Sequence, residues 1–321
     1  YDASQFVTTD DVYQNATPLW EITALQIQAK LMPDINAGIV PVITGFIGAT
    51  HSGTFTTLGR GGSDFSGAIL AAYTHSDQLI IWTDVDGVMT TDPRLDKRAR
   101  VLPYVSYQEV GELAYYGAKV LHPKTVQPIM AQKIPLYVRN TFNPDHPGTL
   151  IGEEAQPSST VIKAVTSVKS VSMLTISGRG MIGVPGIAGR AFTAVSRAGA
   201  SILMLSQSSS EQSMCCVVTD EKADHAKAAV EAEFRLEIER QNIENIDVAH
   251  EIVIVTVVGS GMRGTPGVAG RVFTALGTER LNVLAIAQGS SECSISFVVA
   301  QSDLEHAVMT LHTLALESVA P

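Results

Sequence analysis

The sequence predicts an α/β protein in two parts: an α/β sandwich with a mostly parallel sheet, followed by two βαββαβ modules. Three observations predict it. Short apolar runs alternate with helical patterns and loops as far as about Asn140. The stretch from Asn143 to Thr160 is rich in Pro, Gly, Ser and Glu, as is typical of a linker. Beyond it, one module occurs twice, and such a repeat indicates two copies of one supersecondary unit.

The first part contains recognisable start signals. Thr17 followed by Pro18 predicts the start of a helix that runs to Lys30. Ile39 to Ile47 (IVPVITGFI) predicts a buried strand, and a polar hairpin or loop is expected from Gly48 to Thr56. The glycine-rich loop after Leu58 leads into a helix, and Gln78 to Trp82 predicts a parallel-sheet strand.

The repeat keeps a constant offset of 81 residues, so that Ser177 matches Val258. Of the 42 positions aligned from these two residues, 20 are identical. In the first copy we expect strands and helices in the following order: Val171–Ile176, Gly186–Ala198, Ser201–Leu205, Met214–Thr219 and Glu221–Phe234. In the second copy, the apolar run Ile252–Val258 predicts the first strand.

Composition excludes several classes of protein. The 321-residue chain has a net charge of −10 and a pI near 5.2, which argues against nucleic acid or an anionic membrane as the main partner. No apolar run reaches the ~20 residues of a membrane span. Three cysteines without CxxC spacing, expected in buried strands, indicate a reducing compartment, and we expect a cytoplasmic location. The eight histidines lack metal-ligand spacing, so we predict no protein-derived metal site.

The loop Gly59-Arg60-Gly61-Gly62-Ser63-Asp64 carries the first candidate site. Its glycines let the backbone turn with N–H groups facing outward, and the start of the following helix adds unpaired donors. Arg60 adds a guanidinium that suits a carboxylate or phosphate. The loop therefore predicts an anion site, with a flexible turn capped by Ser63 or Asp64 as the equal alternative.

Polar residues also follow the strand predicted at Gln78–Trp82. Thr83, Asp84 and Asp86 come at its carboxyl end, where open α/β sheets bind ligands. They suit a magnesium-bound phosphate or a ribose, although a simple Asp-Gly turn is the commoner structure. Arg94 and Lys119 supply cations that suit polyphosphate, although each alone is more often a solvated surface charge.

The repeated loops show a pattern that resembles a dinucleotide site. Gly178–Gly183 and Gly259–Gly264 both match GxGxxG, but a proline follows each and no acid closes the next strand. We therefore favour a shared loop geometry over NAD binding. Gln207 and Gln288 lie where the second strand of each module ends. They are placed to bind a free amino acid, or to form ordinary turns.

Three motifs in order now indicate a family. LGRGGSD, WTDVDGVMTTDPR and GAKVLHP, followed by the two modules, resemble aspartate kinase over nearly the whole chain. The resemblance implies a three-layer αβα sandwich of the amino-acid-kinase type and two ferredoxin-like ACT domains. It implies transfer of the γ-phosphoryl group of ATP, with Mg²⁺, to the β-carboxylate of aspartate, with feedback control by lysine or threonine.

The resemblance also implies roles for particular residues. Aspartate binding and catalysis are expected at Arg60, Gly61, Gly62, Ser63 and Asp64. Nucleotide contacts are expected at Thr83, Asp84, Met89, Arg94, Lys119 and Val120. Effector binding is expected at Gly186, Ala188 and Gln207 in the first module and at Gly267, Ala269 and Gln288 in the second. Met89 stands where the family usually has an aromatic residue, so adenosine packing is expected to be looser.

The resemblance sets the expected domains: residues 1–155 for the nucleotide-binding side of a kinase domain, 156–249 for the first ACT domain and 250–321 for the second. The second module is often inserted into the first in this family, so the final strands are expected to be exchanged. A homo-oligomer through the ACT domains is expected. The Lys-Phe-Gly-Gly-Thr-Ser loop of the family is missing, so we expect a fragment that is inactive alone. The alternatives are a non-catalytic amino-acid-sensing subunit and one part of a fusion with homoserine dehydrogenase.

Overall fold

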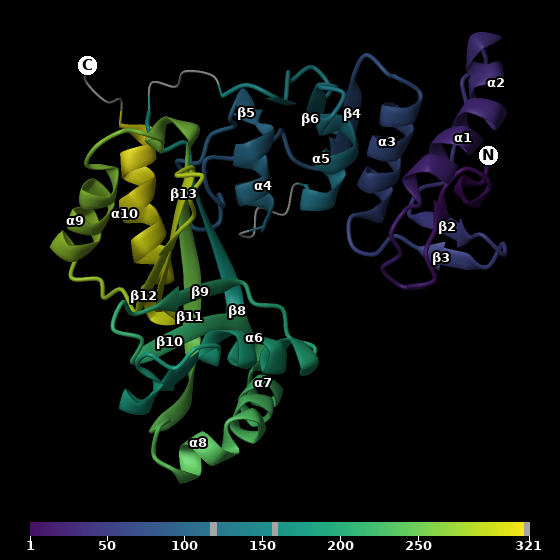
Figure 1. The fold of residues 1–321 in the computed structure, drawn as a ribbon. Helices are drawn as coiled ribbons and strands as arrows, with labels where there is room; N and C mark the ends of the chain where they lie inside the picture. The colour runs from purple at the N-terminus through teal and green to yellow at the C-terminus, as the bar shows by residue number, and fades with distance from the viewer. Residues whose placement is uncertain (116–120, 156–159, 318–321) are drawn as a thin grey trace. The chain divides into compact units, whose positions relative to one another are not determined.

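The computed structural model describes residues 1–115, 121–155 and 160–317. Within them the chain forms two compact units (Figure 1). The N-terminal unit comprises Tyr1–Thr90 and Ala99–Pro157, and the C-terminal unit comprises Thr91–Arg98 and Ser158–Pro321. The chain therefore leaves the N-terminal unit at Thr90, returns at Ala99 and leaves it again at Pro157, within the expected linker. No described helix is long and apolar enough to cross a membrane.

The N-terminal unit contains two sheets. The first has the order β1-β2-β3, from Thr8–Thr9, Ile47–Thr50 and Phe55–Thr57. Three helices belong to the same part of the chain: α1 (Trp20–Lys30) and α2 (Met32–Asn36) between β1 and β2, and α3 (Gly62–Tyr73) after β3. Phe6, Ile27, Leu58 and Phe65 are in a buried core that joins the helices to this sheet.

The second sheet has the order β4-β6-β7-β5, from Leu79–Thr83, Leu136–Asn140, Thr149–Gly152 and Tyr104–Ser106. Two of its pairings are parallel, β4 with β6 and β5 with β7, whereas β6 and β7 are antiparallel. Helices α4 (Tyr107–Tyr115) and α5 (Pro123–Met130) connect these strands. The α/β class is confirmed.

Two expectations for this unit were wrong. The run expected as a buried strand from Ile39 forms one only at Ile47–Thr50. No described strand pairs with its first residues, and Val40 and Val42 are 85% and 82% exposed. The linker expected from Asn143 contains strand β7. Its residues Thr149 and Ile151 are fully buried in the sheet.

The C-terminal unit is a six-stranded antiparallel sheet with the order β12-β13-β11-β8-β10-β9. The first repeat supplies β8 (Ala164–Ser177), α6 (Ile187–Arg197), β9 (Met204–Gln207), β10 (Ser213–Thr219), α7 (Asp220–Glu233) and α8 (Arg235–Glu239). The second supplies β11 (Asn245–Val258), α9 (Val268–Thr278), β12 (Ala285–Gln288), β13 (Ser294–Ala300) and α10 (Leu304–Leu316). In the first repeat, the strand expected from Ser201 is β9, which begins three residues later, at Met204.

Two long strands run through both repeats. The first half of β11, Asn245–Ala249, pairs with the second half of β8, and its later half pairs with Ala164–Val168. Each strand has one residue with left-handed backbone beside the register shift in this pairing, Ser170 (φ 58°) and Glu251 (φ 53°). The second repeat thus takes a strand that precedes the first repeat in the chain. The first repeat is inserted into the second, the reverse of the expected order.

The sheet curves so that its two edges approach. Strands β9 and β12 lie close together without a hydrogen-bonded pairing. Six of the seven residues of β13 are buried, so both of its faces are covered. Helices α9 and α10 cover one face, and Val308 and Phe297 pack together there. On the other face Thr256 and Ser296 share a buried hydrogen bond of 2.8 Å.

Small 3₁₀ turns stand where GxGxxG suggested a dinucleotide loop. They span Arg179–Met181 and Ser260–Met262, and the α-helices begin only at Ile187 and Val268. A helix that starts beyond the loop does not present its N–H groups to a pyrophosphate held by that loop. The shared loop geometry was therefore the right interpretation. The cysteines form no disulfide, but Cys215 is only partly buried and Cys293 precedes β13.

Candidate functional site

The loop that contains Arg60 ends at the start of α3. Gly61 is the N-cap of this helix and has left-handed backbone with φ 72°. Within the described residues no side chain caps α3, so neither Ser63 nor Asp64 has the capping role of the alternative interpretation. Arg60 and Ser63 are exposed. The first-turn N–H groups and the guanidinium are therefore available to an anion.

A second helix start lies against this loop. A Cβ atom built on Gly61 would come within 2.4 Å of Cβ of His122, the residue before α5. The ring of His122 accepts a hydrogen bond from the backbone N–H of Lys124. Nζ of Lys124 in turn donates to Oδ1 of Asn15 at 2.6 Å, and Asn15 also touches the loop at Gly59.

Electrostatics around this loop favour a negative ligand. Burial lowers the pKa of His122, and the positive charges of Lys124 and Arg60 lower it further. Burial raises the pKa of the Asp64 carboxyl, because removing it from water penalises its charged form. Asn15, His122 and Lys124 were not predicted as site residues. His122 belongs to the Gly-Ala-Lys-Val-Leu-His-Pro motif, whereas no motif contained Asn15 or Lys124.

A separate polar cluster occupies the end of β4. Thr83 pairs with Asn140 across the parallel strands β4 and β6, and Thr83 donates to Asp84 at 3.2 Å. Asp86 accepts hydrogen bonds from the side-chain amides of Asn140 at 2.8 Å and Asn143 at 3.1 Å. These two bonds lower the pKa of Asp86. Asp84 is exposed, so its carboxylate remains accessible to a ligand.

The remaining expected nucleotide residues divide into three groups. Met89 lies in the N-terminal unit and forms an isolated β-bridge with Val101. Arg94 belongs to the C-terminal unit, where its side chain is 76% exposed and pairs with Asp92 at 2.7 Å. Lys119 and Val120 lie outside the described residues.

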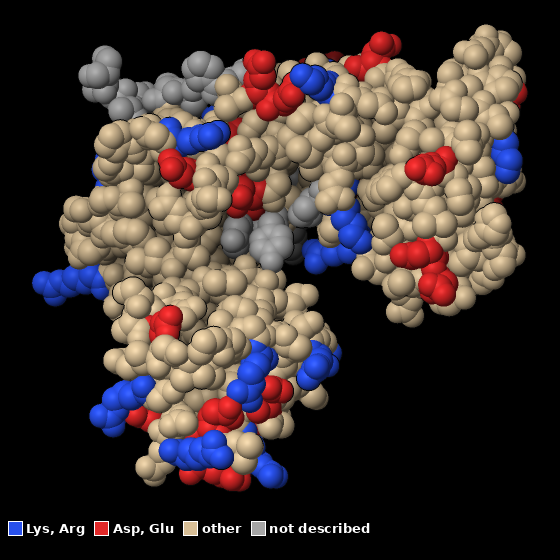
Figure 2. Space-filling view, in the orientation of Figure 1, with Lys and Arg blue, Asp and Glu red and all other residues tan. Residues whose placement is uncertain are grey.

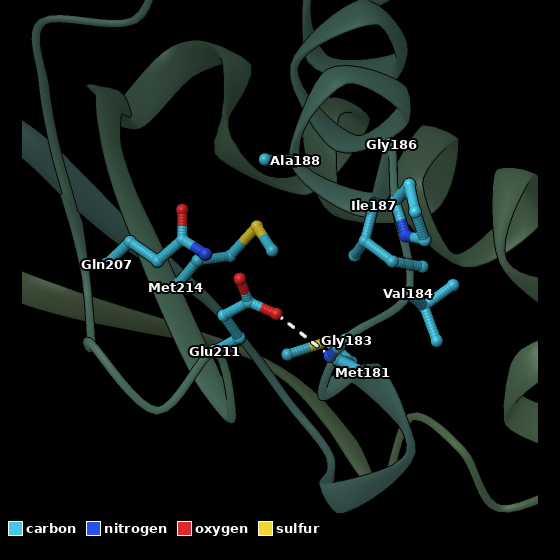
Figure 3. A pocket seen from close by; sticks show the side chains of 10 residues that line it. Met181, Gly183, Val184, Gly186, Ile187, Ala188, Gln207, Glu211 and Met214 are labelled. Carbon is cyan, nitrogen blue, oxygen red and sulfur yellow. Dashed lines mark hydrogen bonds between the residues drawn. The ribbon is translucent and has the colours of Figure 1, made fainter.

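The first repeat contains a cavity of about 250 Å³ (Figure 3). Gly186, Ala188 and Gln207, the three positions expected to bind an effector, all line it, together with Met181, Gly183, Val184, Pro185, Ile187, Glu211 and Met214. Gly186 is the N-cap of α6 with φ 86°, and no described side chain caps that helix. The cavity therefore combines a helix N-terminus, apolar walls and one carboxylate.

Glu211 determines the charge of this cavity. Its Oε2 accepts a hydrogen bond of 2.9 Å from the backbone N–H of Gly183 (Figure 3). The second repeat has the same bond, from Gly264 N–H to Glu292 at 2.8 Å. The positions equivalent to the first three are also arranged alike: Gly267 is the N-cap of α9, Ala269 is in its first turn, and Gln288 ends β12.

Comparison with known proteins follows the division of the chain. A model of the amino acid kinase family matches residues 1–140, and a model of the ACT domain matches residues 174–234 and 255–314. The crystal structure of E. coli aspartokinase III in complex with lysine and aspartate has 30% identity and a TM-score of 0.78. The match covers 99% of this chain and 69% of that one. The chain belongs to the aspartokinase family.

Two further comparisons refine this assignment. The E. coli aspartokinase III complex with aspartate and ADP has 29% identity and a TM-score of 0.82, and the match covers 69% of that chain. The bifunctional aspartokinase/homoserine dehydrogenase of Haemophilus influenzae is 44% identical over 273 residues, which are 85% of this chain and 34% of that protein. This aspartokinase-family chain therefore spans about a third of the length of that curated relative.

Proposed function

We propose that this protein is an aspartate kinase, which transfers the γ-phosphoryl group of ATP to the β-carboxylate of aspartate and yields 4-phosphoaspartate. One observation carries the proposal: a chain of the aspartokinase family places the Arg60 loop at two adjoining helix starts. This arrangement suits a small dicarboxylate. The aspartate bound in the E. coli aspartokinase III structures supports the choice of substrate.

Aspartate would bind at the Arg60 loop. Its carboxylates suit the guanidinium of Arg60 and the N–H groups at the start of α3, because both are donors to anions. Asp64, in the first turn of α3, suits the substrate ammonium group. Since the β-carboxylate of aspartate is already ionised near pH 7, the nucleophile needs no general base.

ATP would bind where β4 ends. Thr83 and Asp84 are accessible there, and the two amides hold Asp86 in place. No group of three or more His, Cys, Asp or Glu residues in the described chain can hold a metal ion. Mg²⁺ would therefore be held mainly by the phosphates, with Asp84 as the accessible carboxylate. It would supply charge neutralisation, and the protein would contribute alignment and electrostatic stabilisation.

We further propose that lysine or threonine regulates the enzyme through the cavity of the first repeat. The start of α6 suits the α-carboxylate of an amino acid, and Glu211 suits an ammonium group. The cavity volume of about 250 Å³ lies below the usual range for drug-sized ligands, which begins at about 300 Å³. This size favours a single amino acid.

The cavity also favours a second candidate, a non-catalytic amino-acid-sensing subunit. All ten of its lining residues belong to the first repeat, so effector binding does not require the kinase unit. Homo-oligomerisation through the ACT domains and a cytoplasmic location complete the proposal.

Calorimetry with ADP, aspartate, lysine and threonine separates the two candidates. For a kinase, ADP and aspartate bind, and Asp84→Asn and Arg60→Ala each weaken their own ligand at least tenfold. Asp77→Asn is the matched control for Asp84→Asn, because exposed Asp77 precedes the opposite end of β4. Effector binding without any ADP binding supports the sensor and refutes the kinase.

A second pair of variants tests the effector site. Glu211→Gln should weaken binding of the effector at least fivefold if the first cavity is the site. Glu292→Gln removes the corresponding carboxylate of the second repeat and should leave that affinity within twofold. Equal losses in the two variants would contradict assignment to the first repeat.

A further inference from the structure

The hairpin Val88–Leu102 has its two ends in one unit and its tip in the other. In the N-terminal unit, Leu102 N–H donates to Val88 O at 2.8 Å and Thr90 N–H donates to Arg100 O at 2.9 Å. Val88 N–H also donates to the buried hydroxyl of Thr149 in β7 at 2.8 Å. The base of the hairpin is therefore fixed to the sheet β4-β6-β7-β5, in which strand β4 ends at Thr83 and leads into the loop that contains Asp86.

The tip segment, Thr91–Arg98, packs with the C-terminal unit. Leu95 packs against the core of the second repeat. Asp96, only 5% exposed, accepts hydrogen bonds from Arg98 Nη2 at 2.7 Å and shares a 2.8 Å bond with Nδ1 of His312 in α10. Arg98 Nη2 also donates to Met309 O and Thr313 Oγ1, both at 3.2 Å.

The first repeat provides an internal comparison for this face of α10. At the offset of 81 residues, buried Leu311 of α10 corresponds to buried Val230 of α7, so the two helices keep one register. His312, fully buried, corresponds to Glu231, whose side chain is 48% exposed.

A neighbouring position repeats the contrast. Val308, also fully buried, corresponds to Lys227, whose side chain is 36% exposed and which pairs with Glu231 on the helix surface. Figure 2 shows charged side chains of both signs spread over the region of α7 and α8. The second repeat thus has a buried face where the first has a charged surface, and the tip segment is what packs against it.

We infer that the hairpin Val88–Leu102 couples the second repeat to the nucleotide end of β4, and that Asp96 is the positioning residue that fastens it. The inference rests on the proposed function, which places the nucleotide at Thr83 and Asp84. Those residues lie just before the base of the hairpin. Helix α10 packs in turn on α9, with Leu311 and Leu276 in one buried core, and α9 begins after Gly267, one of the expected effector positions.

The competing explanation is a contact that stabilises the fold and does nothing else. Loss of Asp96 would then lower the free energy of unfolding but leave ligand affinities of the folded protein unchanged. A coupling role predicts a selective change instead, because the base of the hairpin begins four residues after Asp84, at the proposed nucleotide site. Typical couplings between sites correspond to about 5- to 150-fold in affinity.

The experiment compares the 321-residue chain with its variants Asp96→Asn and Arg98→Lys. Arg98→Lys keeps the positive charge beside Asp96 but removes the guanidinium bonds to Met309 and Thr313, so it buries no unpaired carboxylate and is expected to fold. Glu231→Gln is the matched control on α7. ADP and aspartate affinities are measured by calorimetry, and backbone hydrogen exchange is followed over residues 88–102.

Coupling predicts faster exchange of the hairpin and at least fivefold weaker ADP binding in both variants, with aspartate affinity within twofold of wild type. The control should change neither. ADP affinity within twofold of wild type in folded Arg98→Lys, despite faster exchange of the tip, overturns the inference and leaves the proposed function intact. If the wild-type chain binds no ADP, the proposed function fails first and the inference falls with it.

Discussion

Gly61→Ala should destabilise the N-terminal unit much more than Gly38→Ala. Both glycines have left-handed backbone, with φ 72° and φ 82°. For any residue with a Cβ atom this conformation costs about 1–2 kcal/mol. The surroundings differ, because a Cβ atom on Gly38 would meet nothing within 4 Å, whereas one on Gly61 would lie 2.4 Å from Cβ of His122.

The difference between the two variants measures the contact between the two helix starts. Cβ of His122 cannot swing away by a side-chain rotation, so α5 or the loop must shift, and such overpacking costs typically about 1–3 kcal/mol. We therefore expect a loss of about 1–2 kcal/mol for Gly38→Ala and about 2–5 kcal/mol for Gly61→Ala.

Urea unfolding provides the assay. The chain has two tryptophans, Trp20 and Trp82, and both lie in the N-terminal unit, so their fluorescence reports on that unit. With a urea dependence of about 2 kcal/mol per molar, the added clash of about 1–3 kcal/mol should lower the midpoint by roughly 0.5–1.5 M relative to Gly38→Ala. Equal midpoints for the two variants would falsify the packing of the Arg60 loop on His122.

Three further predictions concern charged residues. Burial raises the pKa of Asp64, so folding favours its protonated form, and any stability gained this way is lost as pH rises through the folded pKa. At pH 7, Asp64→Asn should therefore raise the free energy of unfolding by roughly 0.5–1 kcal/mol, and with it the melting temperature, while weakening aspartate binding. A lower melting temperature would contradict this. Arg190 pairs with Glu233 and Glu237 and lies 4.6 Å from the ring centre of Phe234. Arg190→Ala should therefore lower the free energy of unfolding, measured by chemical denaturation, by about 1–3 kcal/mol. The equivalent substitution in the second repeat, Arg271→Ala, should lower it by under about 0.5 kcal/mol, and similar losses would count against the Arg190 cluster. Arg98, with His312, holds the pKa of Asp96 well below its usual range. The stability that Asp96 adds is therefore present above its unfolded pKa of about 3.9 and is lost as pH falls below that value. The urea midpoints of wild type and Asp96→Asn should differ at pH 7 and converge at lower pH, and a gap that widens on acidification would refute the role of the ion pair.

The sequence was sufficient where local signals and burial agree. The glycine loop before α3, the strand β4 and most elements of the repeats follow from residue patterns alone, and the offset of 81 residues predicted that both modules share one loop. It failed where long-range pairing decides the outcome. Ile39–Ile47 has the composition of a buried strand, yet pairing with β1 and β3 begins only at Ile47.

The site shows the same limit. Arg60, Thr83 and Asp84 could be proposed because each follows a strand or precedes a helix in the sequence. Asn140, which holds Asp86, could not be proposed, because its contact is with a residue 54 positions away along the chain. Nor does a local pattern reveal that Asp96 meets His312 across 216 positions. Such contacts exist only once the sheets and helices have formed.

The path of β8 sets the order in which parts of the C-terminal unit can fold during synthesis. Once residue 249 has left the ribosome, the first repeat has all of its strands and helices and can fold. Ala164–Val168, made earlier, must wait for Ile254–Val258, and the pairing of Val168 with Ile254 closes a loop of 86 positions (254 − 168). A nascent chain therefore displays the unpaired segment Ala164–Val168 throughout that interval, and a second repeat produced from residue 250 onward would lack the edge strand that this segment supplies.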